Sequence, residues 1–399
     1  MSSQDAHLAL CTAYGARGVP KLVETLRSAD VDDPSPTRTA LTTLHSLLST
    51  QENKCAVVAS EDAVVLLTAQ LAAPDEGCRR LAALVIGALA LMLQGRIAVR
   101  EAASVGVLAG LLADGADAVR EAASSALLAL SQSRDGCSTL MEHDGIVDAL
   151  VAALGDDAAG APALGCLSTL ANLSRLDLGV AAALDAGLMA ILCAVVGAKA
   201  SIPQLYPALQ TLWNLANSAD GKVAAIDCQA LSHLAWHVAR GGGDARRLAA
   251  GCVMAITVDK QGKFEALDCV APLCALALSP AVADDSDPDA PPPDASAVRD
   301  AVGALKNLAE WPQARKQIAK IFRREGADKL LVEGPNGDAV PLFDRPITDG
   351  GVWPESERFV HQNVAPGGAA TKAERAVGLP RAARLLRVSS ASPVWPVCV

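Results

Sequence analysis

The sequence predicts an all-α solenoid. Three observations carry this prediction: the composition, the spacing of apolar residues and an internal repeat of about 42 residues. Hydrophobic residues make up 51% of the 399-residue chain, but aromatic residues only 3%. Ala and Leu supply most of the apolar content, and both favour helices. Because a single core seldom grows beyond about 250–300 residues, the chain must form several domains or a stack of repeats.

A similar phrase recurs along most of the chain, in which an apolar helix ends at a turn and a short helix follows. Two examples are STLANLSRLDLGVAAALD at 168–185 and QTLWNLANSADGKVAAID at 210–227. The turns recur every 41 to 43 residues, with a longer last step, and are anchored at Asn53, Gly95, Gly136, Gly179, Gly221, Gly262 and Ala314. This period fits armadillo or HEAT solenoids, so we expect a right-handed superhelix of about seven repeats.

Each repeat should contain an apolar helix, a turn, a short helix and a second apolar helix, as in residues 123–157. Apolar residues recur three and four positions apart, which is the helical spacing. Glycine is expected where one helix ends and the next crosses it sharply, because Gly tolerates a left-handed backbone. Four glycines are predicted to have this role: Gly18, Gly106, Gly145 and Gly187.

Two segments depart from the repeat. Residues 279–296 are rich in Pro and Asp and have little to bury, which predicts an exposed acidic loop inserted in the solenoid. Residues 333–399 begin with a Pro- and Gly-rich stretch that lacks helical period. The predicted organisation is therefore a solenoid over residues 1–332 and an extended, partly basic C-terminal tail over 333–399.

Charge and hydropathy exclude several classes of function. The net charge of −10 is a poor match for nucleic acid, whose binding requires a basic surface. The longest apolar run, residues 81–93, is shorter than the roughly 20 residues of a membrane-spanning helix. The N-terminus lacks the pattern of a signal peptide. We therefore expect neither nucleic acid nor membrane as a partner.

The eleven cysteines indicate a reducing compartment. Their number is odd, none has C-x-x-C spacing, and most lie in apolar helical stretches. A disulfide framework or a zinc site would group them more closely. They are predicted to be small buried hydrophobic residues of an intracellular protein.

The sequence contains no catalytic constellation. It lacks a G-x-S-x-G elbow and a G-x-x-x-x-G-K-[ST] loop, and the glycines of 239–247 are expected to form a turn between helices. His233 and His237 are four apart, but Leu234 stands where a metalloprotease needs Glu, and no third ligand is evident. The protein is predicted not to be an enzyme, with no cofactor and no metal, and with structural or solvated histidines.

Several stretches resemble the armadillo repeat, and the resemblance covers about residues 10–332. They include GVPKLVETL (18–26), STLANLS (168–174), TLWNLAN (211–217) and ALKNLAE (304–310). The resemblance implies that Asn172, Asn214 and Asn307 line a concave groove, where that family's asparagines bind an extended peptide backbone. The alternative is that these asparagines bond only within their own repeat or to water.

The asparagine row departs from the family pattern in two ways. Other repeats hold Ser46, Ala129 and Ala255 at the same position, so the row is interrupted. In nuclear import adaptors a groove-facing Trp stands four residues before each such Asn, but here these positions hold Ser168, Gln210 and Gly303. Trp213, next to Asn214, lies on a different face of the helix. A groove without a Trp array loses its cation–π slots for basic side chains. Asn172, Asn214, Asn307 and Trp213 remain the candidate partner-binding residues.

A narrower resemblance is to the armadillo-repeat radial spoke proteins of motile cilia. It rests on TAYGARGVPKL (12–22), ITVDKQGKFEALDCVAPL (256–273) and AVRDAVGALKNLAEWPQARKQIA (297–319). It implies a structural subunit of the axonemal radial spoke, in the cytoplasmic cytoskeleton of a cilium or flagellum, that supports motility. The implied partners are other spoke proteins, with the doublet microtubule surface as a further partner. The alternative is a soluble armadillo adaptor that binds linear peptides for transport or signalling.

The end of the tail is basic. Residues 371–388 carry one Glu and five basic residues: Lys372, Arg375, Arg381, Arg384 and Arg387. These residues are predicted to form a short helix that docks on an acidic partner. The alternatives are a disordered tail or one that folds back on the acidic body.

Overall fold

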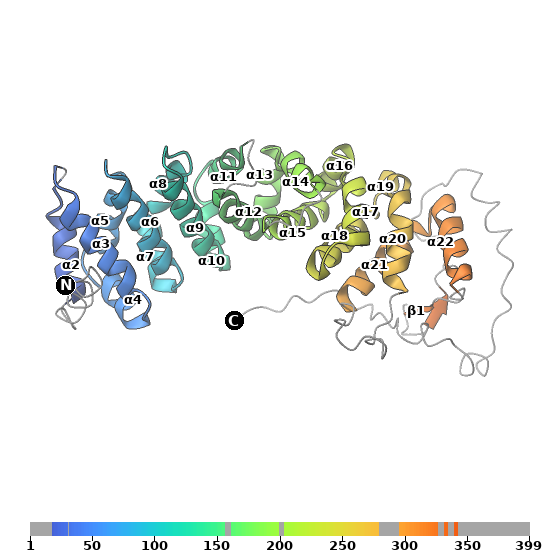
Figure 1. Cartoon of the computed structure of the whole chain (residues 1–399), viewed down its shortest axis with the longest axis horizontal. Helices are drawn as coiled ribbons and strands as arrows, with labels where there is room; N and C mark the ends of the chain where they lie inside the picture. Colours follow the sequence, from blue (N-terminus) through green and yellow to red (C-terminus); the bar gives the residue numbers. More distant parts are fainter. Residues whose placement is uncertain are drawn as a thin grey trace. The chain divides into compact units, whose positions relative to one another are not determined.

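A computed structural model describes residues 18–30, 32–155, 161–198, 203–278, 295–325, 331–333 and 339–341. Most of these residues are helical, and Figure 1 shows the helices following one another as stacked repeats. The all-α solenoid predicted from the sequence is therefore confirmed. By its internal contacts the chain divides into two units, residues 1–191 with 202–214 and residues 192–201 with 215–399. We call them unit 1 and unit 2 and describe each by itself.

Each repeat contains a first, a second and a third helix. Among the described residues the first helices are α4 (Gln51–Val58), α7 (Leu93–Glu101), α10 (Arg134–Met141), α13 (Asp177–Asp185), α16 (Ala219–Asp227), α19 (Lys260–Glu265) and α22 (Pro312–Arg324). The second helices are α2 (Gly18–Arg27), α5 (Ala63–Gln70), α8 (Ser104–Leu111), α11 (Ile146–Leu154), α14 (Leu188–Gly197), α17 (Ala230–Arg240) and α20 (Val270–Ala277), with the 3₁₀ turn η2 (Ala266–Cys269) before α20.

The third helices are the longest in most repeats and end just before the anchors found in the sequence. They are α3 (Ser35–Leu47), α6 (Glu76–Ala90), α9 (Asp117–Ser131), α12 (Ala161–Leu173), α15 (Leu205–Ala216), α18 (Gly243–Ile256) and α21 (Ala295–Leu308). In unit 1, α3, α6, α9 and α12 pack side by side in chain order, and in unit 2 α18 packs on α21. Their inner faces form the cores, with side chains such as Ile86, Leu127 and Leu305 fully buried.

The first turn of each first helix lies very close to the end of the third helix before it. The anchor residues lie inside the first turn of the first helix, whereas the sequence pattern predicts them in the turn before it. Four caps hold this turn in place, because the side chains of Thr50, Ser133, Ser218 and Asp259 accept hydrogen bonds from the backbone N–H groups at the anchors. A Cβ at Gly136 would lie 1.8 Å from the carbonyl oxygen of Leu130. The anchor glycines are therefore required by close approach and not by backbone angle.

The prediction for the turn glycines is right for Gly145 and Gly187 and wrong for Gly106. Gly145 and Gly187 have positive φ, of 81° and 72°, directly before α11 and α14. Gly106, however, lies inside α8, while Gly18 is the first residue of α2 and the residues before it lie outside the described ones. In the repeat of Gly106 the left-handed position is taken by Ala103, with φ 52°. The bend before the second helix thus recurs even where the residue is not Gly.

The boundaries at the C-terminal end differ slightly from those predicted. α21 begins at Ala295, two residues inside the predicted loop, and residues 279–294 lie outside the described residues. The last helix, α22, ends at Arg324. β1 (Leu331–Glu333) and β2 (Ala339–Pro341) then pair antiparallel, with Val332 opposite Val340, across the predicted boundary at 332.

Cysteines act as core residues, as predicted. Seven of the nine described cysteines are buried, and Cys55 is exposed. Burial raises the pKa of the Cys166 thiol to about 12, so this thiol stays protonated at neutral pH. Among the described helices no single one is long and apolar enough to span a membrane; α13 and α14 reach that length only as a pair, with a bend of 82° between them.

Candidate functional site

The three asparagines named from the sequence bond to the preceding repeat. In unit 1, Asn172 Nδ2 donates to Ser131 Oγ at 2.9 Å, and Asn214 Nδ2 donates to Ser174 Oγ at 3.0 Å and to the Ala171 carbonyl at 3.1 Å. In unit 2, Asn307 Nδ2 donates to Thr257 Oγ1 at 3.3 Å and to the Met254 carbonyl at 3.0 Å. These amides therefore staple neighbouring third helices together. The alternative that they bond only within their own repeat or to water is wrong.

The staple leaves a signature in the sequence. Ser131, Ser174 and Thr257 occupy one position of the repeat, five residues before the anchor, and each precedes a repeat that carries the Asn. Repeats with Ala88, Ala129 or Ala255 at the Asn position follow repeats with Leu48, Ala90 or Ala216. Asparagine and hydroxyl thus occur as pairs, because each satisfies a buried polar group of the other.

Removing one staple is expected to cost about 1 kcal/mol of unfolding free energy, the usual net value of a hydrogen bond. Asn172→Ala and Ser131→Ala should each destabilise unit 1 by this amount, and the double variant should cost little more than either single one. Urea unfolding of the four proteins measures the coupling. Strictly additive losses would mean that the bond between these side chains does not stabilise the fold.

Half-buried and exposed residues of α12 and α15 form two matched rows in unit 1, which we call the stripe pair. Leu164, Ser168 and Asn172 lie on α12, and the residues 42 positions later, Tyr206, Gln210 and Asn214, lie on α15. Spacings of four place each row along one side of its helix. Leu164 and Tyr206 are 38% and 48% exposed, so both rows end in an accessible apolar side chain.

Trp213 adds to the stripe pair. It is half-buried and stands seven positions after Tyr206, which puts the two rings nearly in line along α15. Gln210 lies between them, and its Nε2 donates to Asn214 Oδ1 at 3.1 Å. Of the four predicted partner-binding residues, the structure thus gathers Asn172, Trp213 and Asn214 in unit 1. The sequence analysis did not predict that Leu164 and Tyr206 occupy equivalent positions, although they are 42 residues apart in the sequence.

Asn307 lies in unit 2, in different surroundings. Four positions before it stands Gly303, where a Cβ would lie 2.5 Å from the sulfur of Met254. A side chain like Ser168 or Gln210 is therefore excluded there unless Met254 moves. The Asn307 staple is present in unit 2, but the row of side chains around it is not.

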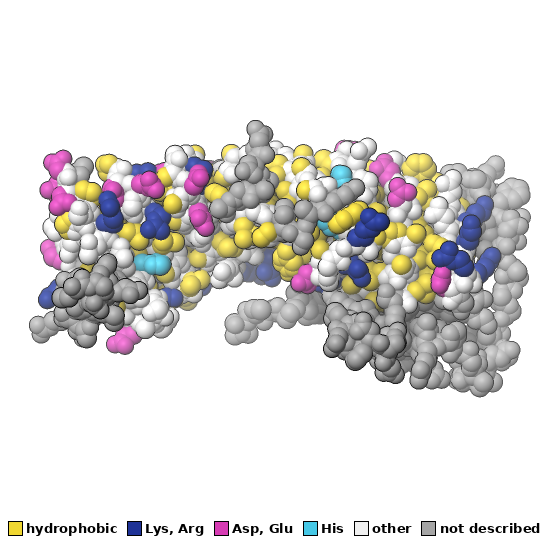
Figure 2. Space-filling view, in the orientation of Figure 1, with side chains coloured by type: hydrophobic (Ala, Val, Ile, Leu, Met, Phe, Trp, Pro, Cys, Tyr) yellow, Lys and Arg dark blue, Asp and Glu magenta, His cyan; other side chains and the backbone are white. Residues whose placement is uncertain are grey.

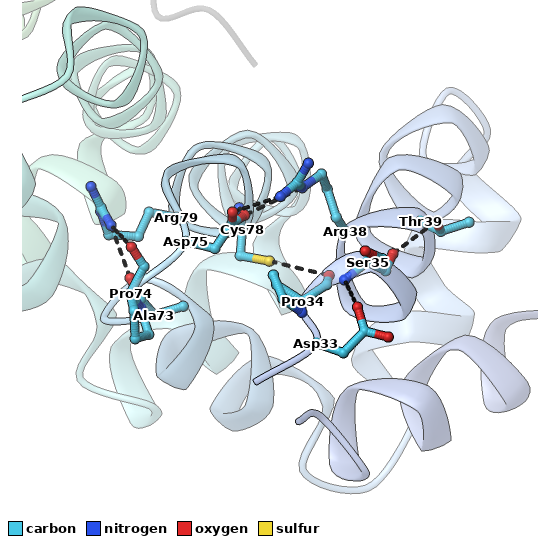
Figure 3. Close-up of polar contacts among 10 residues, drawn as sticks. All are labelled: Asp33, Pro34, Ser35, Arg38, Thr39, Ala73, Pro74, Asp75, Cys78 and Arg79. Atoms are coloured by element: carbon cyan, nitrogen blue, oxygen red, sulfur yellow. Dashed lines mark hydrogen bonds and ion pairs between the residues drawn. The ribbon is translucent and has the colours of Figure 1, made fainter. Parts of the chain in front are cut away.

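Arginine–aspartate pairs connect successive repeats near the start of the third helices of unit 1. Figure 3 shows Arg38 of α3 turned toward Asp75, whose Oδ2 lies 2.6 Å from Arg38 Nη2. Arg79 repeats the arrangement one repeat later, with Nε 2.8 Å and Nη2 3.1 Å from the Asp114 carboxylate. Asp75 also caps α6 by accepting from the Cys78 N–H at 2.8 Å. These two-point contacts fix the spacing of repeats.

The Arg79–Asp114 pair predicts acid sensitivity. The hydrogen bond from the Arg79 guanidinium lowers the pKa of Asp114 below its usual value. The pair therefore stabilises the fold fully above the unfolded pKa, near 4, and its contribution is lost as pH falls through the lower folded pKa. Asp114→Asn should be less stable than wild type at pH 7 and should lose less stability between pH 5 and pH 2. Thermal unfolding across this range measures both; equal acid slopes would contradict the role of Asp114.

His233 and His237 do not form a metal site with a third ligand among the described residues. His237 is buried, and its Nε2 donates to the Val196 carbonyl at 2.8 Å, which is the structural role predicted. His233 lies against Gly197. Within the described part of the chain, no group of three His, Cys, Asp or Glu side chains is placed to hold a metal ion. Gly241 and Gly242 form the predicted turn between α17 and α18, whereas Gly243 is already the first residue of α18.

The basic tail residues lie outside the described residues, so their docking role stays a prediction. They are Lys372, Arg375, Arg381, Arg384 and Arg387.

Comparison with known proteins shows which solved structures have a similar fold. No protein-family model and no curated protein matches the chain. An engineered protein solved by the Northeast Structural Genomics Consortium is 22% identical, with a TM-score of 0.64 over 76% of this chain and 71% of that one. A designed armadillo repeat protein is 19% identical, with a TM-score of 0.54 over 60% of this chain and 99% of its own. A second designed armadillo repeat protein, solved with the peptide (KR)4, is 21% identical with the same TM-score and coverage. The chain thus has an armadillo-like solenoid fold.

Proposed function

We propose that the chain is a non-enzymatic protein-binding scaffold, and that the stripe pair of unit 1 holds an extended segment of a partner. The observation that carries this proposal is the register of the two rows, in which equivalent side chains recur 42 residues apart. An extended peptide also presents equivalent groups at regular intervals. A repeated row can therefore receive it with the same contact in each repeat.

The chemistry of the stripe pair suits a peptide backbone. The Nδ2 atoms of Asn172 and Asn214 are committed to the preceding repeat, which fixes the direction of each side-chain amide. Each Oδ1 has two lone pairs, and at Asn214 one of them accepts from Gln210. The amide oxygens are thus suited to accept from the N–H groups of a peptide. Tyr206 and Trp213 supply apolar area at low cost in side-chain entropy.

The binding proposal is tested by selecting peptides from a random twelve-residue display library on the full chain. Tyr206→Ala/Trp213→Ala should weaken the best peptide by at least about ten-fold, since buried aromatic side chains are typical hot spots. Val65→Ala/Leu178→Ala is the matched control, because both residues are exposed and lie on other helices. Equal affinities for all three proteins would overturn the proposal.

We propose further that this scaffold is a subunit of the axonemal radial spoke, with other spoke proteins and the doublet microtubule as partners. The support is the resemblance of residues 12–22, 256–273 and 297–319 to spoke proteins of motile cilia. Under this proposal the protein is located in the axoneme of a cilium or flagellum, and the basic tail contributes to docking.

Fractionation of motile cilia tests the spoke proposal. Membranes are stripped with detergent, axonemes are extracted with high salt, and each fraction is probed for this chain. We expect the protein in the axonemal fraction and its loss from cilia that lack spokes. Recovery from the cytosol alone would favour the soluble peptide adaptor. Deleting residues 342–399, the part of the predicted tail that follows β2, should weaken incorporation into the axoneme. Unchanged incorporation would exclude a docking role for this part of the tail.

A further inference from the structure

The last helix of unit 2, α22, has one buried and one basic face. Ala314, Arg315, Ile318 and Phe322 are buried, and α22 packs against α20. Lys316, Lys320 and Arg323 are exposed. Their spacings of four and three place them along the opposite side of the helix, over about 10 Å. The buried face fixes the orientation of α22, so the basic face must point outward.

The three charges of this face, which we call the basic stripe, have no ion-pair partner among the described residues. Neighbouring Arg324 pairs with Glu325 at 2.9 Å. Figure 2 shows Lys and Arg side chains gathered at the end of unit 2 where Figure 1 places α22. In unit 1, by contrast, Arg38, Arg79 and Arg96 each pair with an aspartate.

The basic stripe contrasts with the chain as a whole, whose net charge is −10. Residues 312–324 contain five basic residues and no acidic one. Arg315 has a structural role, because its Nε donates a hydrogen bond to the carbonyl of Ala309, the residue that follows α21. Lys316, Lys320 and Arg323 make no such contact with other described residues, so none of the described contacts in unit 2 requires their charge.

We propose that the basic stripe of α22 is a docking surface for an acidic segment, rich in Glu or Asp, of a partner protein. Three charges over about 10 Å match a few residues of an extended acidic peptide at about 3.3 Å per residue. Duplex DNA is disfavoured because it presents a charge about every 1.7 Å over a longer track, and the acidic remainder of the chain repels it. A lipid surface is disfavoured because Ile318 and Phe322 face the core and cannot insert.

The test measures binding of a fluorescently labelled twelve-residue glutamate peptide to the full chain by anisotropy at low salt. Lys316→Glu/Lys320→Glu/Arg323→Glu should weaken binding by about ten-fold or more, as expected for three exposed ion pairs. Binding to wild type should also fall as salt rises. Circular dichroism should show unchanged helix content, because all three side chains point away from the core.

Two control variants separate the basic stripe from net charge and from the tail. Arg80→Glu/Arg100→Glu/Arg134→Glu makes the same change in charge at exposed positions of unit 1 and should bind nearly as wild type. Replacing the five basic tail residues by Gln should leave most of the affinity. The proposal is overturned if wild type does not bind the peptide, if either control loses as much affinity as the α22 variant, or if anionic vesicles or duplex DNA of equal charge bind more tightly.

Discussion

Replacing Gly136 by Ala is expected to destabilise unit 1 by about 2–3 kcal/mol, and more if the joint cannot shift. The new Cβ would lie 1.8 Å from the carbonyl oxygen of Leu130 and 2.9 Å from its carbonyl carbon. Both atoms belong to the backbone of α9, so no side-chain rotation relieves the contact. Either the end of α9 or the start of α10 must move, and the Ser133 cap on the Gly136 N–H is lost with it. Urea unfolding measures the loss.

Gly110→Ala is the matched control for this prediction. Gly110 lies in α8 of the same unit, and no atom lies within 4 Å of a Cβ built on it. The substitution should be neutral or stabilising by up to about 1 kcal/mol, because Ala favours the helix over Gly. If Gly136→Ala were no more harmful than Gly110→Ala, the close approach at the joint would not be what selects glycine there.

Replacing Glu310 by Ala is expected to cost unit 2 about 3 kcal/mol. Lys263 Nζ lies 2.6 Å from Glu310 Oε2, and the side chain of Lys263 is only 4% exposed. The substitution removes the carboxylate that faces this buried ammonium, and removing one member of a buried pair is the costly way to break it. Thermal and urea unfolding both report the change.

Two further variants test whether charge burial causes this loss. Glu325→Ala removes an exposed partner of Arg324, whose side chain is 79% exposed, and should cost less than about 1 kcal/mol. Lys263→Met/Glu310→Leu removes both charges and should recover much of the stability lost in Glu310→Ala. Failure of this recovery would assign the loss to packing, including the edge contact of Phe264 with Trp311.

The fold was predictable because the same helical pattern recurs in each repeat. Helical spacing and the anchors near 42-residue intervals are local or periodic signals, and the helices lie where these signals put them. The reason for the anchor glycines was not predictable in the same way. A sequence reading assigns glycine to a left-handed turn, whereas Gly136 is needed because two backbones touch. That contact joins two helices in space and leaves no local pattern in the sequence.

The candidate site was predicted in part. The armadillo resemblance pointed to Asn172, Asn214 and Trp213, which lie on the stripe pair. It did not predict that the amides bond to Ser131 and Ser174, because each partner lies in another repeat at a different position. The basic stripe of α22 was also missed. Its spacing is that of an ordinary amphipathic helix, and only the structure shows that its three charges lack an ion-pair partner among the described residues.

The asparagine staples restrict the order in which repeats can follow one another. A third helix that carries the Asn must follow one that carries the hydroxyl, so repeats cannot be exchanged freely along the chain. The repeat that contains Asn172 also contains Ser174, and it therefore carries both halves of the connection. Among the repeats that carry the Asn or the hydroxyl, it alone could form the staple with a copy of itself on either side. A tandem duplication of this repeat would therefore keep every staple.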